Sequence, residues 1–159
     1  MAIASLIASE NISAGNAVYV TSTGQAALAS ADTVTKASVL GIAIDTVTSG
    51  AILRINADGV YTGYAGLTPG DFRYLSINTP GSLISYGEFL VELAAVSIDP
   101  FLTNVGRVIT PTTLSIETIP PQLVVNPTSI ILLESSAGLT IEALLLEDGS
   151  TIDLETASA

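Results

Sequence analysis

The chain of 159 residues is long enough for one domain with a substantial core, or for a domain with an additional arm. Apolar residues make up 48% but charged residues only 12%, where soluble domains usually have about 25%, so we expect other protein to cover much of the surface. The net charge is −11 and the four cations are scattered singly, which argues against nucleic acid as a partner.

Short strands separated by turn residues are predicted along the first 64 residues. A helical turn capped by Asp32 is expected to run to about Lys36. Asp58-Gly59 favours a two-residue hairpin that would pair the strands on either side of it. The strands expected here cover residues 17–23, 25–29, 39–45, 51–57 and 59–64.

Two Thr-Pro-Gly turns follow, at residues 68–70 and 79–81, and bracket an alternating strand over residues 72–77. Stiff turns at both ends would fix the length and register of that strand. Residues 89–98 are predicted as a strand, with helix as the alternative. Further strands are expected at residues 105–109 and 114–119.

The character of the chain changes at Pro120-Pro121, because neither proline can donate a hydrogen bond within a central strand. The last 40 residues carry six carboxylates and no cation but are densely apolar, unlike a disordered acidic tail. Strands are expected over residues 129–133, 139–147 and 150–156, with Asp148-Gly149 as a hairpin turn. This segment would pack on its own domain, on another subunit or on another protein.

These patterns predict an all-β protein: a compact β-barrel or β-sandwich with one short helix, plus a C-terminal β-rich arm or small subdomain. The domain boundary is placed between a module of residues 1–119 and an arm of residues 120–159.

Enzymatic chemistry is not expected. The chain has no Cys and no His, which excludes thiol nucleophiles and a Ser–His–Asp triad and removes the commonest metal ligands. Glu88 and Glu92 could form a paired-carboxylate site, but surface carboxylates are the better interpretation. Residues 148–153 resemble a calcium loop only faintly and fit a hairpin turn better. We therefore expect no cofactor, no metal, no small-molecule substrate and, without a long apolar run, no membrane partner.

Two groups of residues are candidates for partner contact. Four tyrosines could line a glycan-binding shelf, although such residues more often cap the core of a small barrel: Tyr61, Tyr64, Tyr74 and Tyr86. Arginines inside strands could pair with carboxylates where subunits meet, or could simply be solvated. The residues considered for contacts with another subunit or another protein are Arg54, Arg73, Arg107, Pro120, Pro121, Ile131 and Leu133.

Several phrases along the chain match, in order, the motifs of one known protein module. Its opening resembles residues 8–20 (ASENISAGNAVYV), and its next two strands resemble residues 24–29 (GQAALA) and 39–43 (VLGIA). Its Thr-Pro-Gly turns resemble residues 66–70 (GLTPG), 74–76 (YLS) and 79–81 (TPG). The closing strands resemble residues 105–108 (VGRV) and 114–116 (LSI). Together these phrases resemble a module of tailed-bacteriophage structural proteins. The resemblance spans residues 8–116, and residues 120–159 have no counterpart in the module.

The resemblance implies a capsid decoration, or cement, protein. Such a protein would be a non-enzymatic homotrimer that binds the major capsid protein on the outer surface of the virion. It would be made in the host cytoplasm and would stabilise the expanded head against internal DNA pressure. The same module occurs in tail-fibre domains, so the alternative is a tail-fibre or baseplate module that binds a host glycan or receptor.

Overall fold

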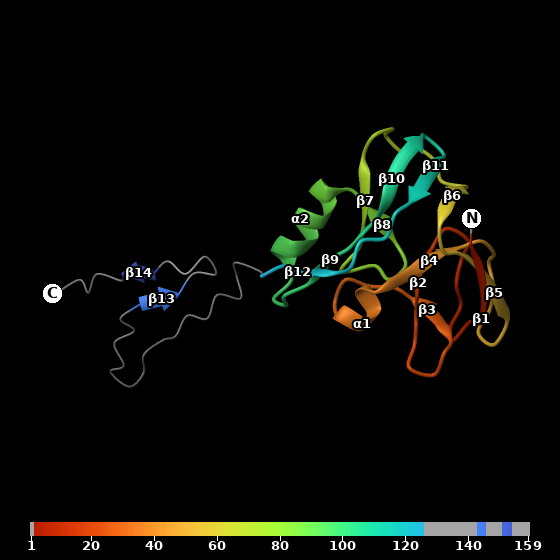
Figure 1. Cartoon of the computed structure of the whole chain (residues 1–159), viewed down its shortest axis with the longest axis horizontal. Coiled ribbons are helices and arrows are strands. Elements are labelled where there is room, and N and C mark those ends of the chain that lie inside the picture. The colour runs from red at the N-terminus through yellow and green to blue at the C-terminus, as the bar shows by residue number, and fades with distance from the viewer. Residues whose placement is uncertain (1, 126–142, 146–150, 154–159) are drawn as a thin grey trace. The chain divides into compact units, whose positions relative to one another are not determined.

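Two units make up the chain in the computed structural model, Met1–Ser129 and Ile130–Ala159 (Figure 1). The structure describes residues 2–125, 143–145 and 151–153. Within the described part of the first unit, short antiparallel strands form two five-stranded sheets and one two-stranded sheet, and the chain also forms two helices. The predicted all-β fold is confirmed.

The first sheet has the strand order β1-β5-β4-β2-β3, and each pair of neighbours is antiparallel. Its strands are β1 (Ile3–Ile7), β2 (Ala17–Val20), β3 (Ala26–Leu28), β4 (Val39–Ala43) and β5 (Ile52–Asn56). In β5 the alternation is as the sequence indicates: Leu53 and Ile55 are fully buried, and Arg54 between them is exposed. Strand β1 was not predicted.

The short helix α1 (Val34–Ala37) lies between β3 and β4, but Asp32 does not cap it. Thr33 occupies the N-cap position, and its side chain makes no capping hydrogen bond. The Asp32 carboxylate instead accepts a hydrogen bond of 2.7 Å from Lys36 one turn later. The predicted cap is therefore wrong, because the carboxylate pairs with an ammonium group rather than with the helix backbone.

The second sheet has the order β6-β11-β10-β7-β8. Its strands are β6 (Gly59–Thr62), β7 (Phe72–Leu75), β8 (Leu83–Ile84), β10 (Asn104–Thr110) and β11 (Thr113–Ile116). A separate pair joins β9 (Phe101–Leu102) to β12 (Gln122–Leu123). This pair keeps residues 122–123 within the first unit. That unit extends to Ser129, which is ten residues beyond the end of the module expected from the sequence, residue 119.

Both Thr-Pro-Gly turns form as predicted. Gly70 and Gly81 have φ angles of 95° and 78°, and each follows a proline at the second turn position. The amide of Asp71 donates to the carbonyl of Thr68 at 3.2 Å, and the amide of Ser82 donates to that of Thr79 at 3.1 Å. Proline followed by a glycine of positive φ is the pattern of a type II turn.

The predicted hairpin at Asp58-Gly59 is wrong. Strand β5 pairs with β1 and β4 in the first sheet, whereas β6 pairs with β11 in the second. Asp58 instead accepts a hydrogen bond from the backbone amide of Ala2. The tight turn therefore passes the chain from one sheet to the other instead of folding it back on itself.

Residues 89–98 are not a strand either, and the helical alternative is confirmed for most of the segment. Helix α2 (Tyr86–Ala95) occupies most of this segment and lies beside the second sheet (Figure 1). It begins with a capping box, in which Ser85 and Glu88 exchange side-chain and backbone hydrogen bonds. Phe89 is the one fully buried side chain of the helix, and it packs in the larger hydrophobic cluster with Leu75 and Val105.

Two hydrophobic clusters form the core of the first unit. The larger contains residues of both sheets, including Ile42, Leu75 and Val105. The smaller lies within the first sheet and its loops, around Val18 and Leu53.

Strand β1 forms an edge of the first sheet. Within the described part of the chain, only β5 pairs with it. The side chains of Ile3 and Ile7 are exposed, and no residue of β1 is charged.

In the second unit, β13 (Ala143–Leu145) pairs in antiparallel fashion with β14 (Thr151–Asp153). Leu144 lies opposite Ile152, so the predicted pairing of the last two runs is confirmed. The predicted strand at 129–133 and the turn at 148–149 lie outside the described residues. Of the helices that are described, none has the length and apolar character needed to cross a membrane.

Candidate interaction surface

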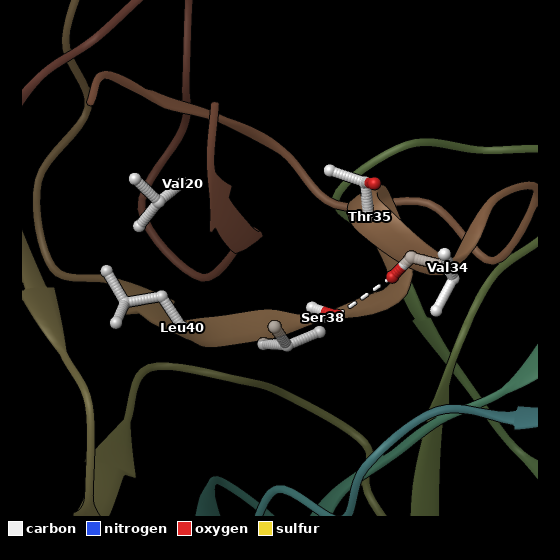
Figure 2. Close-up of a pocket in the computed structure, with 6 residues that line it drawn as sticks. Val20, Val34, Thr35, Ser38 and Leu40 are labelled. Carbon is white, nitrogen blue, oxygen red and sulfur yellow. Dashed lines mark hydrogen bonds between the residues drawn. The ribbon is translucent and has the colours of Figure 1, made fainter. Parts of the chain in front are cut away.

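An uncharged groove opens beside helix α1 (Figure 2). It has a volume of about 440 Å³ and receives side chains from β2, α1 and β4. Figure 2 shows Val20 and Leu40 on one side of this region and the α1 residues Val34 and Thr35 on the other. The residues that line it are Val20, Val34, Thr35, Ser38, Val39 and Leu40.

The geometry of α1 makes this groove less polar than its residue types suggest. The hydroxyl of Ser38 donates to the carbonyl of Val34 at 2.8 Å, which satisfies the last turn of the helix (Figure 2). Val34 and Val20 keep 53% and 40% of their surface exposed. The groove therefore presents aliphatic side chains to solvent.

A second groove, of about 310 Å³, shares Ser38 and Val39 with the first. Its other wall is formed by Thr118, Ile119, Pro120 and Pro121. The amide of Ile119 donates to Asn104 at 3.0 Å before the prolines, and the amide of Val124 donates to Pro100 at 2.8 Å after them. Pro120 and Pro121, two of the residues expected at an interface, therefore lie in a segment that is anchored on both sides.

The two grooves together form what we call the valine–proline surface. It consists of Val20, Val34, Val39, Leu40, Ile119, Pro120 and Pro121. None of these residues is charged, and the cation closest in sequence, Lys36, is paired with Asp32. The hydrogen bond from Lys36 to Asp32 raises the pKa of the Lys36 ammonium group.

The arginines do not join this surface. Arg54 forms two hydrogen bonds with Asp45, from Nε at 2.7 Å and from Nη2 at 2.6 Å. The guanidinium holds the pKa of Asp45 below its usual value. This bidentate pair lies within one chain, so Arg54 already has a carboxylate partner without a neighbouring subunit.

Arg73 lies in β7 and Arg107 lies in the neighbouring strand β10, but their side chains are on opposite faces of the second sheet. Arg73 is opposite Gly106 in the register and Arg107 is opposite Phe72, and neighbouring residues of a strand alternate. Arg73 is largely buried and lies 3.9 Å from the exposed carboxylate of Glu88. The guanidinium of Arg107 lies 5.7 Å from the ring centre of Phe72. The structure thus does not gather the three arginines into one patch.

Of the remaining predicted contact residues, Ile131 and Leu133 lie outside the described residues. The four aliphatic residues on the α1 side of the surface, Val20, Val34, Val39 and Leu40, were not singled out from the sequence. An apolar residue in a short strand is usually buried, and no local pattern marks these as exposed.

The two carboxylates considered as a catalytic pair have structural contacts. Glu88 accepts hydrogen bonds from the amide and hydroxyl of Ser85, which lower the pKa of Glu88. Glu92 accepts from the amide of Ile77 at 2.7 Å and from the hydroxyl of Ser76 at 2.8 Å. Each carboxylate therefore accepts a hydrogen bond from a backbone amide, Glu88 from one at the start of α2 and Glu92 from one just after β7.

The four tyrosines separate into two ring pairs. Tyr61 and Tyr64 pack edge to face with centroids 5.2 Å apart, and the Tyr64 hydroxyl donates to the carbonyl of Gly15 at 2.8 Å. Burial raises the pKa of Tyr64 well above its usual value. Tyr74 and Tyr86 form a second pair, with centroids 5.6 Å apart. The structure therefore does not assemble one shelf from all four.

Within the described ranges, the structure contains no cluster of three or more metal-ligating side chains. No known protein-family model matches the sequence, and a search of curated proteins found no significant match.

Proposed function

We propose that this chain is a structural virion protein that binds the outer surface of a bacteriophage capsid and cements neighbouring major capsid subunits as a homotrimer. The observation that supports the proposal best is the valine–proline surface, an uncharged apolar region on a protein with few charges. The order of the phage-module motifs along residues 8–116 supports it independently.

The surface offers a useful amount of binding free energy. Complete burial of one valine or leucine side chain contributes roughly 1.5–3 kcal/mol, and the surface supplies several that are partly exposed. Ordering costs are small because β4, α1 and the anchored proline segment are already fixed. One such contact gives modest affinity by itself.

Trimerisation would convert modest contacts into slow dissociation. When one subunit of a trimer is attached, the other two bind at a high effective concentration. A closed trimer also matches the three-fold symmetry that capsid shells present. The proposed mechanism is therefore multivalent burial of apolar surface across capsid subunits, which resists their separation by internal pressure.

Copy number in purified virions tests this proposal most directly. Quantitative mass spectrometry of virions that contain the chain should find it in numbers comparable to the major capsid protein. Sedimentation of the purified full-length chain should give the mass of a trimer. A handful of copies per virion would overturn the cementing role and favour the tail-fibre alternative, and a strict monomer that fails to bind expanded heads would also overturn it.

A pair of matched variants tests the surface itself. Val34 and Val91 are both exposed valines on helices, at 53% and 71%, but only Val34 lies on the valine–proline surface. Val34→Glu should weaken attachment to expanded heads by about tenfold or more, and Val91→Glu should leave it unchanged. Thermal unfolding of both variants controls for the fold. Equal retention of the two variants on heads would remove this surface from the proposal.

A further inference from the structure

A pocket with aromatic walls lies between the second sheet and the start of α2, and the valine–proline surface does not include it. It has a volume of about 320 Å³, at the lower end of the range of small-molecule sites. Phe72 and Tyr74 reach it from β7, and Tyr86 reaches it from the first turn of α2. Phe72 and Tyr86 keep 43% and 51% of their surface exposed, so their rings are available to a ligand.

The aromatic rings of the pocket do not stack face to face but are tilted relative to one another. The planes of Tyr74 and Tyr86 meet at 55°. Phe72 lies on the same face of β7 as Tyr74, two residues away, and Arg107 packs against its ring. This leaves aromatic faces of different orientation around one shallow depression.

The pocket is rigid before any ligand binds. Asp71 closes the type II turn through its amide, and its carbonyl accepts from the amide of Val108 at 2.8 Å. The amide of Gly70 donates to the carbonyl of Val108, also at 2.8 Å. On the opposite side, the capping box fixes Ser85 and the start of α2. A preformed site binds with little ordering cost.

The polar groups of the pocket suit hydroxyl groups. The side chain of Asp71 has no hydrogen-bond or ion-pair partner within the described part of the chain, so its carboxylate is available as an acceptor. The phenol hydroxyls of Tyr74 and Tyr86 can both donate and accept. An aromatic face together with a carboxylate acceptor matches a ligand that has an apolar C–H face and a rim of hydroxyls.

We propose that this pocket binds a neutral saccharide, with one sugar ring packed on Tyr86 and Phe72 and its hydroxyls bonded to Asp71. A neutral ligand fits better than an anionic one, because the chain carries a net charge of −11 and Asp71 lies in the pocket. Arg107 is the cation that packs against Phe72, and its Nε–H already donates to the carbonyl of Gly70 at 3.4 Å. This binding activity goes beyond capsid cementing and does not depend on it.

Nuclear magnetic resonance of the full-length chain tests the proposal. The probes are lactose, maltotriose and chitotriose, each titrated to about 10 mM, with sialyllactose as the anionic comparison. At least one neutral probe should shift the ring signals of Tyr74 and Tyr86 and leave those of Tyr64 unchanged. Absence of binding by all three neutral probes, or binding of sialyllactose alone, would overturn the proposal.

Position 87 allows the pocket to be blocked without damage to the fold. Gly87 lines the pocket, and a Cβ atom added there would meet no heavy atom within 4 Å apart from its chain neighbours and the backbone of α2. Gly87→Leu should abolish binding of the neutral probe while keeping or improving thermal stability, since glycine disfavours a helix. The smaller Gly87→Ala should have the same stability effect and weaken binding less. Unchanged binding by Gly87→Leu would overturn the site.

Two further variants separate the contribution of the Tyr86 ring to binding from that of its hydroxyl. Tyr86→Ala should weaken binding of the probe by about tenfold or more, whereas Tyr86→Phe should weaken it less. Attachment of Gly87→Leu to expanded heads should remain normal, which distinguishes failure of this proposal from failure of the cementing role. If Gly87→Leu loses attachment to heads and the parent chain binds no saccharide, the pocket would instead be a contact site for another protein, and the saccharide proposal would be overturned.

Discussion

The carboxylate of Glu92 accepts a hydrogen bond of 2.7 Å from the backbone amide of Ile77. The same carboxylate accepts from the buried hydroxyl of Ser76 at 2.8 Å and from the amide of Asn78 at 3.3 Å. The hydroxyl of Ser76 in turn accepts from the amide of Thr79, which opens the second Thr-Pro-Gly turn. One side chain of α2 thus fixes the end of β7 and the turn that follows it.

We expect Glu92→Leu to lower the free energy of unfolding by about 2–3 kcal/mol, because it leaves the Ile77 amide and the Ser76 hydroxyl without an acceptor in a buried place. Glu92→Gln should cost less, since one amide oxygen can still accept. Urea unfolding of the two variants and the parent measures both effects. A loss for Glu92→Leu no larger than that for an exposed helix substitution such as Val91→Ala would contradict this role.

The capping box of α2 gives a second prediction. Ser85→Ala removes the hydroxyl that accepts from the amide of Glu88, and it should cost about 1 kcal/mol of stability. Thermal or urea unfolding at neutral pH measures it. Ser85→Asp keeps an N-cap acceptor, so it serves as the control and should retain most of the parent stability.

A pH dependence follows from the same contact. Hydrogen bonds from Ser85 hold the pKa of Glu88 below that of an unfolded glutamate. The contribution of Glu88 is therefore complete above the unfolded pKa and is lost as the pH falls through the lower folded value, below about pH 4. In Glu88→Gln, unfolding measured from pH 7 downwards should show a smaller loss over that acidic range. Identical acid profiles for the variant and the parent would contradict the prediction.

Gly81 and Gly70 provide a matched pair at equivalent turn positions. Both have positive φ, so alanine at either position incurs backbone strain of about 1–2 kcal/mol. A Cβ at Gly81 would also come within 2.7 Å of Leu28 Cδ2, whereas at Gly70 it would meet nothing within 4 Å. Gly81→Ala should therefore destabilise the fold by about 1–3 kcal/mol more than Gly70→Ala, as measured by urea unfolding. Equal losses would show that Leu28 moves aside freely.

Tyr64→Phe tests the buried tyrosine pair. It removes the hydroxyl that donates to Gly15 at 2.8 Å and should cost about 1 kcal/mol at neutral pH. Because burial raises the folded pKa of Tyr64, its contribution is complete below the unfolded pKa and declines as the pH rises above about 10. Unfolding at about pH 8 and about pH 10.5 should therefore show a smaller alkaline loss in the variant than in the parent. Tyr61→Phe is the control, since Tyr61 is less buried.

Turn chemistry made part of this fold predictable from local sequence. The Thr-Pro-Gly turns at residues 68–70 and 79–81 formed with the expected hydrogen bonds, because proline and glycine restrict the backbone whatever surrounds them. The alternation around Arg54 was also predictable, because successive side chains of a strand point to opposite faces and one face of β5 is buried. Such signals are local and do not depend on distant partners.

Other features depended on distant partners or on a signal that was overlooked. The Ser85-x-x-Glu88 capping box was present in the sequence and identifies the start of α2, but the apolar run after it was interpreted as a strand. Asp58-Gly59 has the residues typical of a hairpin turn, but β6 pairs with β11, more than 50 residues further along the chain, instead of with β5. The valine–proline surface joins β2, α1 and residues 118–121, so only the folded chain brings it together.

The exposed edge of β1 has a practical consequence for work with this protein. Edge strands in natural proteins often carry a lysine, a proline or a bulge that discourages unwanted pairing, and residues 3–7 have no lysine or proline. Concentrated samples should therefore be prone to aggregate through this edge, next to the exposed Ile3 and Ile7. A gatekeeper substitution such as Ser5→Glu, on the exposed face of the strand and opposite Arg54 in the register, is the change to make first if solubility limits purification or crystallisation.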